Sequence, residues 1–174
     1  MKYIVRFFVI TFLFIGSTHV LAEQSIAFMD MKQILNNSKA GKGAQDYLQK
    51  LFKDGQKKYS DLEIKLKKEE RDLLAKKTIL SKEEYKKNSD MLRDKVIKYQ
   101  KDRRESLDKI AQKRADAKEN LLKKLNPIIE KYTKENNIAL IIDKKNVVAG
   151  LPELDITNKI IEILNKELPT LKLK

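Results

Sequence analysis

The sequence predicts an α+β fold in which a long antiparallel α-helical coiled-coil hairpin projects from a small β-rich body. No proline occurs between Glu23 and Asn126, and this stretch is rich in Lys, Glu, Leu and Asp, which favours helix. A helix start signal in the middle of the stretch indicates that the chain turns back there. Short apolar runs of strand length flank the stretch on both sides and indicate the body.

The first 22 residues have the pattern of a cleavable secretory signal peptide. Lys2 and Arg6 precede a short apolar run, residues 7–15, and Val20 and Ala22 supply small residues for cleavage after Ala22. A membrane anchor is disfavoured, because the apolar run has only half of the roughly 20 residues that cross a bilayer. We therefore expect the mature chain to be exported.

The residue types that are missing exclude most catalytic chemistry. The chain has no cysteine, and its single histidine, His19, lies in the predicted signal peptide. Without imidazole or thiolate groups, Ser-His and Cys-His catalysis and ordinary zinc sites are excluded. Carboxylate chemistry alone would need a pocket, which a thin hairpin does not offer. We expect a non-enzymatic protein with no cofactor and no metal.

Basic residues dominate the charge of the chain. Loss of Lys2 and Arg6 with the signal peptide lowers the formal net charge from +13 only to +11. A strongly basic domain ordinarily indicates nucleic acid as its partner. Export makes nucleic acid unexpected, so the acidic partners that remain are anionic lipids, lipopolysaccharide and acidic polypeptides.

Residues 23–38 are predicted to form a strand and a turn of the body. The apolar run from Ser25 to Met29 has the length of a strand. Asp30 follows the run and could cap a short turn or helix. The polar stretch 36–38 predicts a turn, in which Ser38 is a candidate cap for the long helix that follows.

Residues 39–136 are predicted to form the hairpin, because apolar residues recur in heptad steps along two segments. The first seam consists of Leu48, Phe52, Gly55, Tyr59, Leu62, Leu66, Glu69 and Leu73. The second seam consists of Leu92, Val96, Tyr99, Leu107, Ile110, Arg114, Ala117, Leu121, Leu125, Ile128 and Tyr132. Its register slips by one residue at Arg103. Tyr59 and Tyr99 lie on the seams and are expected in the core, whereas Gly55, Glu69 and Arg103 weaken the seams and make the coiled coil more bendable.

The tip of the hairpin is predicted at about residues 76–81. Ser81 and Glu84 match the S-x-x-E capping box, in which each side chain accepts a hydrogen bond from the backbone amide of the other. A new helix start at this point favours a hairpin over one continuous rod. Arms of about 35 residues would reach roughly 50 Å, and the second arm would continue to about Glu135.

Residues 137–174 are predicted to complete the body with two strands and a C-terminal helix. The apolar run 138–142 predicts one strand, and residues 147–149 predict another that pairs with it as a hairpin. Residues 155–157 offer a cap for the last helix, which Pro169 would end.

Three short strands do not make a stable sheet alone. Several chains that pool their strands would complete the sheet, so we expect the body to be shared between chains. This association would bury the apolar faces of Ile26, Phe28, Leu140 and Ile142.

Some apolar residues of the hairpin lie outside the two predicted seams. They are Leu51, Ile64, Leu74, Ile79, Leu80, Met91 and Ile97. Two interpretations are open: these residues contact a bound polypeptide, or they broaden the packing between the two helices of the hairpin.

The outer half of the hairpin is basic, with eleven basic and seven acidic residues between Lys65 and Lys95. The candidate basic tip consists of Lys65, Lys67, Lys68, Arg71, Lys76, Lys77, Lys82, Lys86 and Lys87. Any single lysine of this set is best interpreted as part of a solvated helix surface. Together, the charges form a field that attracts acidic partners or anionic membrane surfaces. Asp30 and Asp143 end strands and are interpreted as caps, not as catalytic groups.

The order of these motifs resembles the Skp/OmpH family of periplasmic chaperones for outer-membrane proteins. The resemblance rests on residues 26–31 leading to Ile34 and Leu35, on the lysine-rich hairpin, on residues 138–143 and on residues 155–157 before the last helix. It extends over the whole mature chain.

This resemblance implies a homotrimer in which three chains share the body and three arms surround a cavity. It also implies an ATP-independent holdase that binds unfolded outer-membrane proteins in the periplasm, prevents their aggregation and assists their delivery to the outer membrane. An exported structural coiled coil and an envelope protein that binds anionic lipid or lipopolysaccharide are the alternatives. No lipopolysaccharide motif can be assigned to particular residues.

Overall fold

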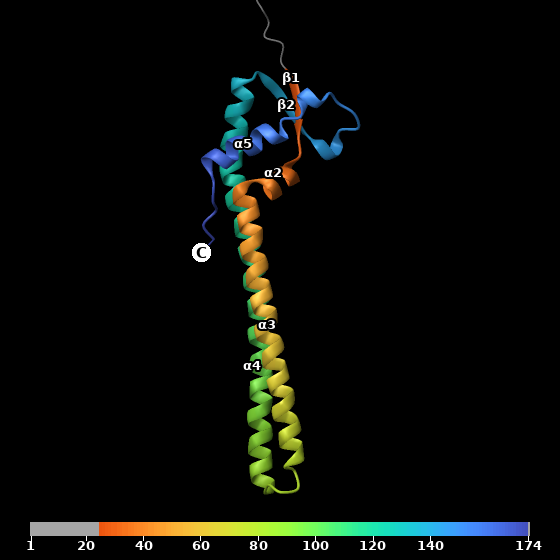
Figure 1. Cartoon of the computed structure of the whole chain (residues 1–174), viewed down its shortest axis with the longest axis vertical. Coiled ribbons are helices and arrows are strands. Elements are labelled where there is room, and N and C mark those ends of the chain that lie inside the picture. Colours follow the sequence, from red (N-terminus) through yellow and green to blue (C-terminus); the bar gives the residue numbers. More distant parts are fainter. Residues whose placement is uncertain (1–24, 174) are drawn as a thin grey trace, which may run out of the picture.

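The computed structural model describes residues 25–173, so the predicted signal peptide and its cleavage after Ala22 lie outside the described residues. Two long antiparallel helices, α3 and α4, form a thin hairpin, and the remaining elements gather at the end opposite its tip (Figure 1). Along the chain the elements are β1 (Ser25–Met29), α2 (Met31–Asn37), α3 (Lys39–Ala75), α4 (Lys82–Glu135), β2 (Ile138–Asp143), the 3₁₀ helices η1 (Lys144–Asn146) and η2 (Pro152–Leu154), and α5 (Thr157–Glu167).

Short polar side chains start the first helices, as the sequence predicts. Asp30 accepts a hydrogen bond from the backbone N–H of Gln33 at 2.8 Å and caps α2. The turn predicted over residues 36–38 is shorter than expected, because α2 continues to Asn37. Ser38 alone separates the helices: its hydroxyl accepts from the N–H of Gly41 at 3.1 Å, and its own N–H donates to the carbonyl of Ile34.

The corner between α2 and α3 depends on Gly41. A Cβ atom at this position would lie 1.8 Å from the carbonyl oxygen of Leu35, so no other residue fits without moving the backbone. This close approach directs α3 away from the body.

The tip of the hairpin contains the predicted capping box. The N–H of Glu84 donates to Ser81 Oγ at 3.2 Å, and the N–H of Ser81 donates to Glu84 Oε2 at 3.1 Å. The hydrogen bonds from Ser81 hold the pKa of Glu84 below its ordinary value. The chain turns between Ala75 and Lys82, and α4 then returns to the body.

The sheet has two strands, and they are parallel. β1 pairs with β2 in a register that places Ile26 beside Leu140 and Phe28 beside Ile142. Parallel neighbours need a long crossover connection, and the whole α3–α4 hairpin supplies it.

The prediction of a third strand at residues 147–149, paired as a hairpin with residues 138–142, is wrong. The Asp143 side chain accepts a hydrogen bond from the N–H of Lys145 at 3.2 Å, which starts η1 and turns the chain out of the sheet. Val148 is fully exposed. Instead, the segment before α5 lies along β1, where the N–H of Ile156 donates to the carbonyl of Phe28 at 3.0 Å.

The core of the body lies between the sheet, α2, α5 and the end of α4. Its buried residues are Ala27, Met29, Ile34, Leu125, Ile128, Ile156, Ile160 and Leu164. Helix α5 ends at Glu167, two residues before Pro169, as expected. The hairpin is therefore anchored through the end of α4, which belongs to the core.

Candidate binding surface of the hairpin

The two helices of the hairpin pack closely only near the body. Here Ala40, Ala44 and Leu48 of α3 are buried. Ala117 and Leu121 of α4 are buried as well. The small alanine side chains allow a close approach of the helices. We call this part, residues 39–59 with 102–125, the base of the hairpin.

Beyond the base, none of residues 60–101 is buried. We call this part the outer arm. Two helices alone cannot enclose a side chain from all directions, so each residue here keeps part of its surface in water. The polar residues Glu69 and Lys95 meet across the two helices at 2.6 Å, where the predicted seam is interrupted. The outer arm is therefore a surface with almost no interior.

The contact line between the helices differs from the predicted seams near the end of the base. Leu51 is half-buried, whereas Phe52, predicted in the seam, is 46% exposed. Leu107 of α4 is likewise 47% exposed. The contact line follows Asp102, Ser106 and Ile110 instead and passes beside Arg103. The predicted seam positions Leu107 and Arg114 therefore lie outside the contact line.

Two tyrosines fix the helices at the boundary between the base and the outer arm. Tyr59 is buried, as predicted, and its hydroxyl donates to the backbone carbonyl of Asp102 at 2.8 Å. Its ring meets that of Tyr99 edge to face, with centroids 6.1 Å apart. The Tyr99 hydroxyl donates to Glu63 Oε2 at 3.3 Å.

A groove of about 340 Å³ lies beside these tyrosines. Phe52 of α3 and Leu107 of α4 line it from opposite helices. Gly55 and Tyr59 of α3 also line it. Arg103 also lines the groove. Sequence reasoning missed this site, because it placed Phe52 and Leu107 in the seams between the helices.

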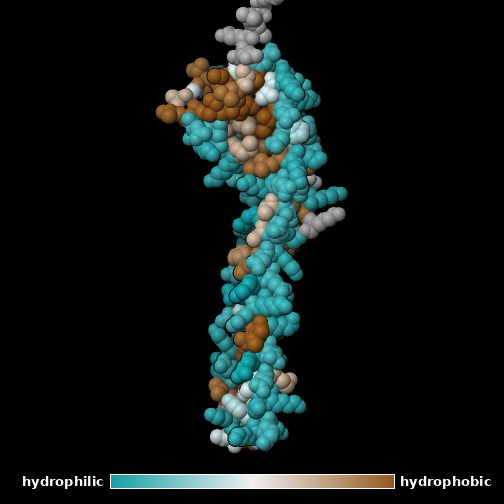
Figure 2. Space-filling model, turned by 180° about the vertical axis from the view of Figure 1, so that it is seen from behind, coloured by the Kyte–Doolittle hydropathy of each residue, from teal (hydrophilic) through white to brown (hydrophobic). Residues whose placement is uncertain are grey.

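The apolar residues predicted outside the seams are mostly exposed and isolated from one another. Ile64, Leu74, Ile79, Met91 and Ile97 are exposed, whereas Leu51 and Leu80 are half-buried. Figure 2 shows separate brown patches along a hairpin surface that is mainly teal. None of the seven belongs to the buried apolar cluster of the body.

All nine residues of the basic tip are exposed on the outer arm. Among them, Lys67 pairs with Glu63 at 2.7 Å, one helical turn before it. The hydrogen bond with Lys67 and its charge lower the pKa of Glu63, and the same contact raises the pKa of Lys67. The basic tip is thus a solvated surface of like charges.

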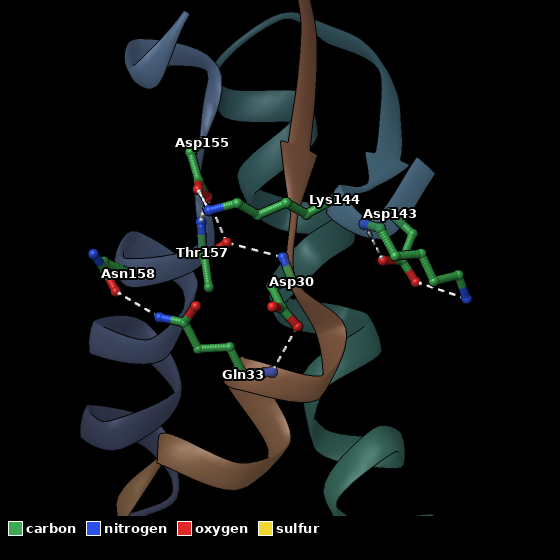
Figure 3. Close-up of polar contacts among 8 residues, drawn as sticks. Asp30, Gln33, Asp143, Lys144, Asp155, Thr157 and Asn158 are labelled. Atoms are coloured by element: carbon green, nitrogen blue, oxygen red, sulfur yellow. Dashed lines mark hydrogen bonds and ion pairs between the residues drawn. The ribbon is translucent and has the colours of Figure 1, made fainter. Parts of the chain in front are cut away.

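A polar network in the body joins the N-terminal strand to the C-terminal helix (Figure 3). The N–H of Asp30 donates to Thr157 Oγ1 at 2.9 Å, and the N–H of Thr157 donates to Asp155 Oδ1 at 3.0 Å. Lys144 Nζ lies 2.6 Å from Asp155 Oδ2. Burial would raise the pKa of Asp155, but hydrogen bonds from Lys144 and Thr157 outweigh it and lower the pKa. Asp155 therefore holds the start of α5 as a carboxylate, and Asp30 and Asp143 serve as caps.

Large apolar side chains are exposed on the body. Ile26, Leu140 and Val148 lie more than half exposed, and so does Leu151. Figure 2 shows a brown cluster at the body end that is larger than any patch on the hairpin. Within residues 25–173, no helix is long and apolar enough to span a membrane. The same residues contain no group of three or more His, Asp or Glu side chains placed to hold a metal ion.

Comparisons with known proteins agree on one family. The model of the family described as "Outer membrane protein (OmpH-like)" matches residues 25–164. A crystal structure of a candidate outer membrane chaperone (OmpH-like) from Caulobacter crescentus CB15 is similar in fold, with a TM-score of 0.80 and 19% sequence identity. The similarity covers 89% of this chain and 92% of that chain. None of the curated proteins matches the chain.

Proposed function

The chain belongs to the OmpH-like outer membrane protein family, and on this premise we propose that it is an ATP-independent holdase chaperone. It binds unfolded outer-membrane proteins in the periplasm, prevents their aggregation and assists their delivery to the outer membrane. The protein is not an enzyme in this proposal and needs no cofactor.

The observation that carries the proposal is the construction of the outer arm. None of residues 60–101 is buried, yet exposed apolar side chains recur along this part within a basic surface. An unfolded β-barrel protein exposes alternating apolar residues and unpaired strand edges. Many weak contacts, spread over a long arm, can cover such a chain without selecting one sequence.

We further propose that the protein is a homotrimer whose chains share the body. A sheet of two short strands is marginal by itself, and its exposed Ile26 and Leu140 are neighbours in the register. Burial of these side chains against other copies would remove an apolar surface that a monomer leaves in water. Three arms would then surround one client.

Anionic lipid or lipopolysaccharide is a second candidate ligand, favoured by the nine exposed residues of the basic tip. A field of this sign attracts anionic surfaces over about one Debye length. A purely structural coiled coil of the envelope is the remaining alternative, and it predicts no effect on unfolded proteins.

Dilution of a denatured outer-membrane β-barrel protein, with and without the mature chain, tests the holdase. We expect turbidity to be suppressed at about a threefold molar excess of subunits, because one trimer would hold one client. A lipid-binding protein would leave the turbidity unchanged and would bind anionic vesicles in a salt-sensitive manner. Unchanged turbidity would exclude the proposed function.

A further inference from the structure

We propose that the groove lined by Phe52, Gly55, Tyr59, Arg103 and Leu107 binds an aromatic side chain from an extended segment of the unfolded client. This inference rests on the proposed function and names the contact that anchors the client to each arm. It assigns that contact to the boundary between the base and the outer arm, away from the basic tip.

The groove exists because one position on the contact line has no side chain. Gly55 faces Ser106 across the two helices, and a Cβ atom at Gly55 would have only Ser106 Oγ within 4 Å, at 3.6 Å. A leucine at such a position would ordinarily fill the space between the helices. The missing side chain leaves a hollow between the two helices. The Tyr59 hydroxyl donates to the backbone carbonyl of Asp102 and holds the helices together beside this hollow.

The groove has two accessible apolar walls, and polar residues such as Gln56, Ser60 and Ser106 complete its lining. Phe52 and Leu107 come from different helices and expose 46% and 47% of their surfaces. Tyr59 also lines the groove, and it is buried and fixed by its hydrogen bond. The volume of about 340 Å³ is near the lower end of the roughly 300–1,000 Å³ found for ligand sites, so it suits one side chain better than a folded element.

The charge in the groove favours an aromatic occupant over an aliphatic one. Glu63 is the acidic residue of the lining, and it is engaged by Lys67 at 2.7 Å and by the hydroxyl of Tyr99. Within residues 25–173 the Arg103 side chain forms no hydrogen bond or ion pair, although its charge acts on Glu63. Its guanidinium therefore remains available to stack on the face of an aromatic ring, while the walls accept the apolar edge.

Unfolded outer-membrane β-barrel strands carry such rings. Girdles of aromatic residues flank the apolar band of these barrels, and every second side chain of an extended strand points to the same side. An arm that captures one girdle residue would hold the strand beside the exposed apolar residues of the outer arm.

The test compares two denatured clients: an outer-membrane β-barrel protein and a variant in which its girdle aromatics are replaced by leucine. Binding of both clients is measured by the fluorescence anisotropy of the same dye, attached outside the girdles, because the leucine client has lost its aromatic reporters. The chaperone has no tryptophan, so tryptophan emission from the aromatic client additionally reports burial of its rings without background. We expect the aromatic client to bind about tenfold more tightly than the leucine client, because several weak anchors act together.

Two chaperone variants should lower this ratio to about one. The double variant Phe52→Ala with Leu107→Ala removes the walls. Gly55→Leu fills the hollow, and leucine has a higher helix propensity than glycine, so this variant should keep the helix. If both groove variants lose the preference for the aromatic client, the common cause is the lost groove. The control, Ile64→Ala with Met91→Ala, removes two apolar residues outside the groove that are at least as exposed as its walls, and it should keep the ratio.

The outcomes separate the inference from the proposed function. If the unmodified chain suppresses aggregation but binds both clients equally, or if the groove variants keep the ratio, the inference is wrong and the holdase stands. If the unmodified chain does not suppress aggregation, the holdase and the inference both fail. Circular dichroism of each variant verifies that the helices are intact.

Discussion

The base and the outer arm of the hairpin are built from the same two helices, yet their helices are held together by different contacts. In the base, alanines such as Ala44 and Ala117 bring the helices together over buried leucines. In the outer arm, charged pairs such as Glu69 with Lys95 replace buried contacts. Exposed ion pairs contribute little to stability. Stability is therefore concentrated near the body, and the outer arm, which we propose meets the client, contributes little to it.

The largest expected effect comes from truncating a leucine at each end of this comparison. Leu125→Ala in the base removes a side chain with no exposed surface, which belongs to the core of the body, and should cost about 3 kcal/mol. Leu66→Ala in the outer arm removes a half-buried side chain and should cost about 1 kcal/mol. Urea unfolding followed by circular dichroism measures both. Equal losses would contradict the division between the two regions.

The polar network of the body gives the next effect, and it depends on pH. The folded-state pKa of Asp155 is lowered, so its contribution is present above the unfolded pKa of about 3.9 and is lost as the pH falls through and below that value. Asp155→Asn should cost about 1–2 kcal/mol at pH 7. The cost should shrink between pH 5 and pH 3. Thermal unfolding across this pH range provides the measurement.

Asp90→Asn is the matched control in the outer arm. Asp90 forms only an exposed pair with Arg93 at 3.8 Å. Its replacement should change stability by less than about 0.5 kcal/mol at either pH. A cost for Asp155→Asn that did not shrink in acid would argue against a carboxylate that holds the start of α5.

A smaller and local effect is expected at the tip. Ser81→Ala removes the hydroxyl that accepts from Glu84, which should destabilise the start of α4 by about 1 kcal/mol. Hydrogen exchange should accelerate for amides near Lys82 and remain unchanged for those of the body core, because few contacts link the two. Acceleration of both regions together would mean that the hairpin unfolds as one unit.

The smallest effect on stability should come from the basic tip. Replacement of Lys76, Lys77, Lys82, Lys86 and Lys87 by glutamine removes five exposed charges and should leave the free energy of unfolding within about 0.5 kcal/mol. Capture of a denatured client should nevertheless slow at low salt, because the field that attracts acidic segments is weaker. Stopped-flow light scattering tests this; an unchanged rate would reduce the charge to a solubility feature.

Local signals in the sequence predicted local structure well. Asp30, Ser38 and Ser81 cap helices because each side chain reaches an amide three residues away, and such contacts depend on little else. The two strands were found from their apolar runs. Their parallel pairing was not, because it depends on the path of the hairpin between them. Val147 to Ala149 resembles a strand in composition, but the turn at Asp143 removes it from the sheet.

The groove was beyond sequence reasoning for a similar reason. A heptad pattern in α3 places Phe52 in the seam. The actual contact line depends also on α4, whose Ser106 lies opposite Gly55. One helix alone carries no information on this pairing. The isolated glycine in an otherwise strong helix was the available signal, since a glycine inside a helix usually has a packing or functional reason.

The parallel pairing of β1 with β2 has a consequence for the order of folding. Within residues 25–173, every backbone partner of β1 lies after the hairpin. These partners are Asn137 to Asp143 on one side of the strand, and Asp155 and Ile156 on the other. A chain that emerges N-terminus first therefore carries its first strand unpaired until both long helices are complete. Zipping of the hairpin from its tip brings the two ends together and shortens the loop that the sheet must close. The arm proposed to meet the client would therefore also connect the two ends of the chain while the body assembles.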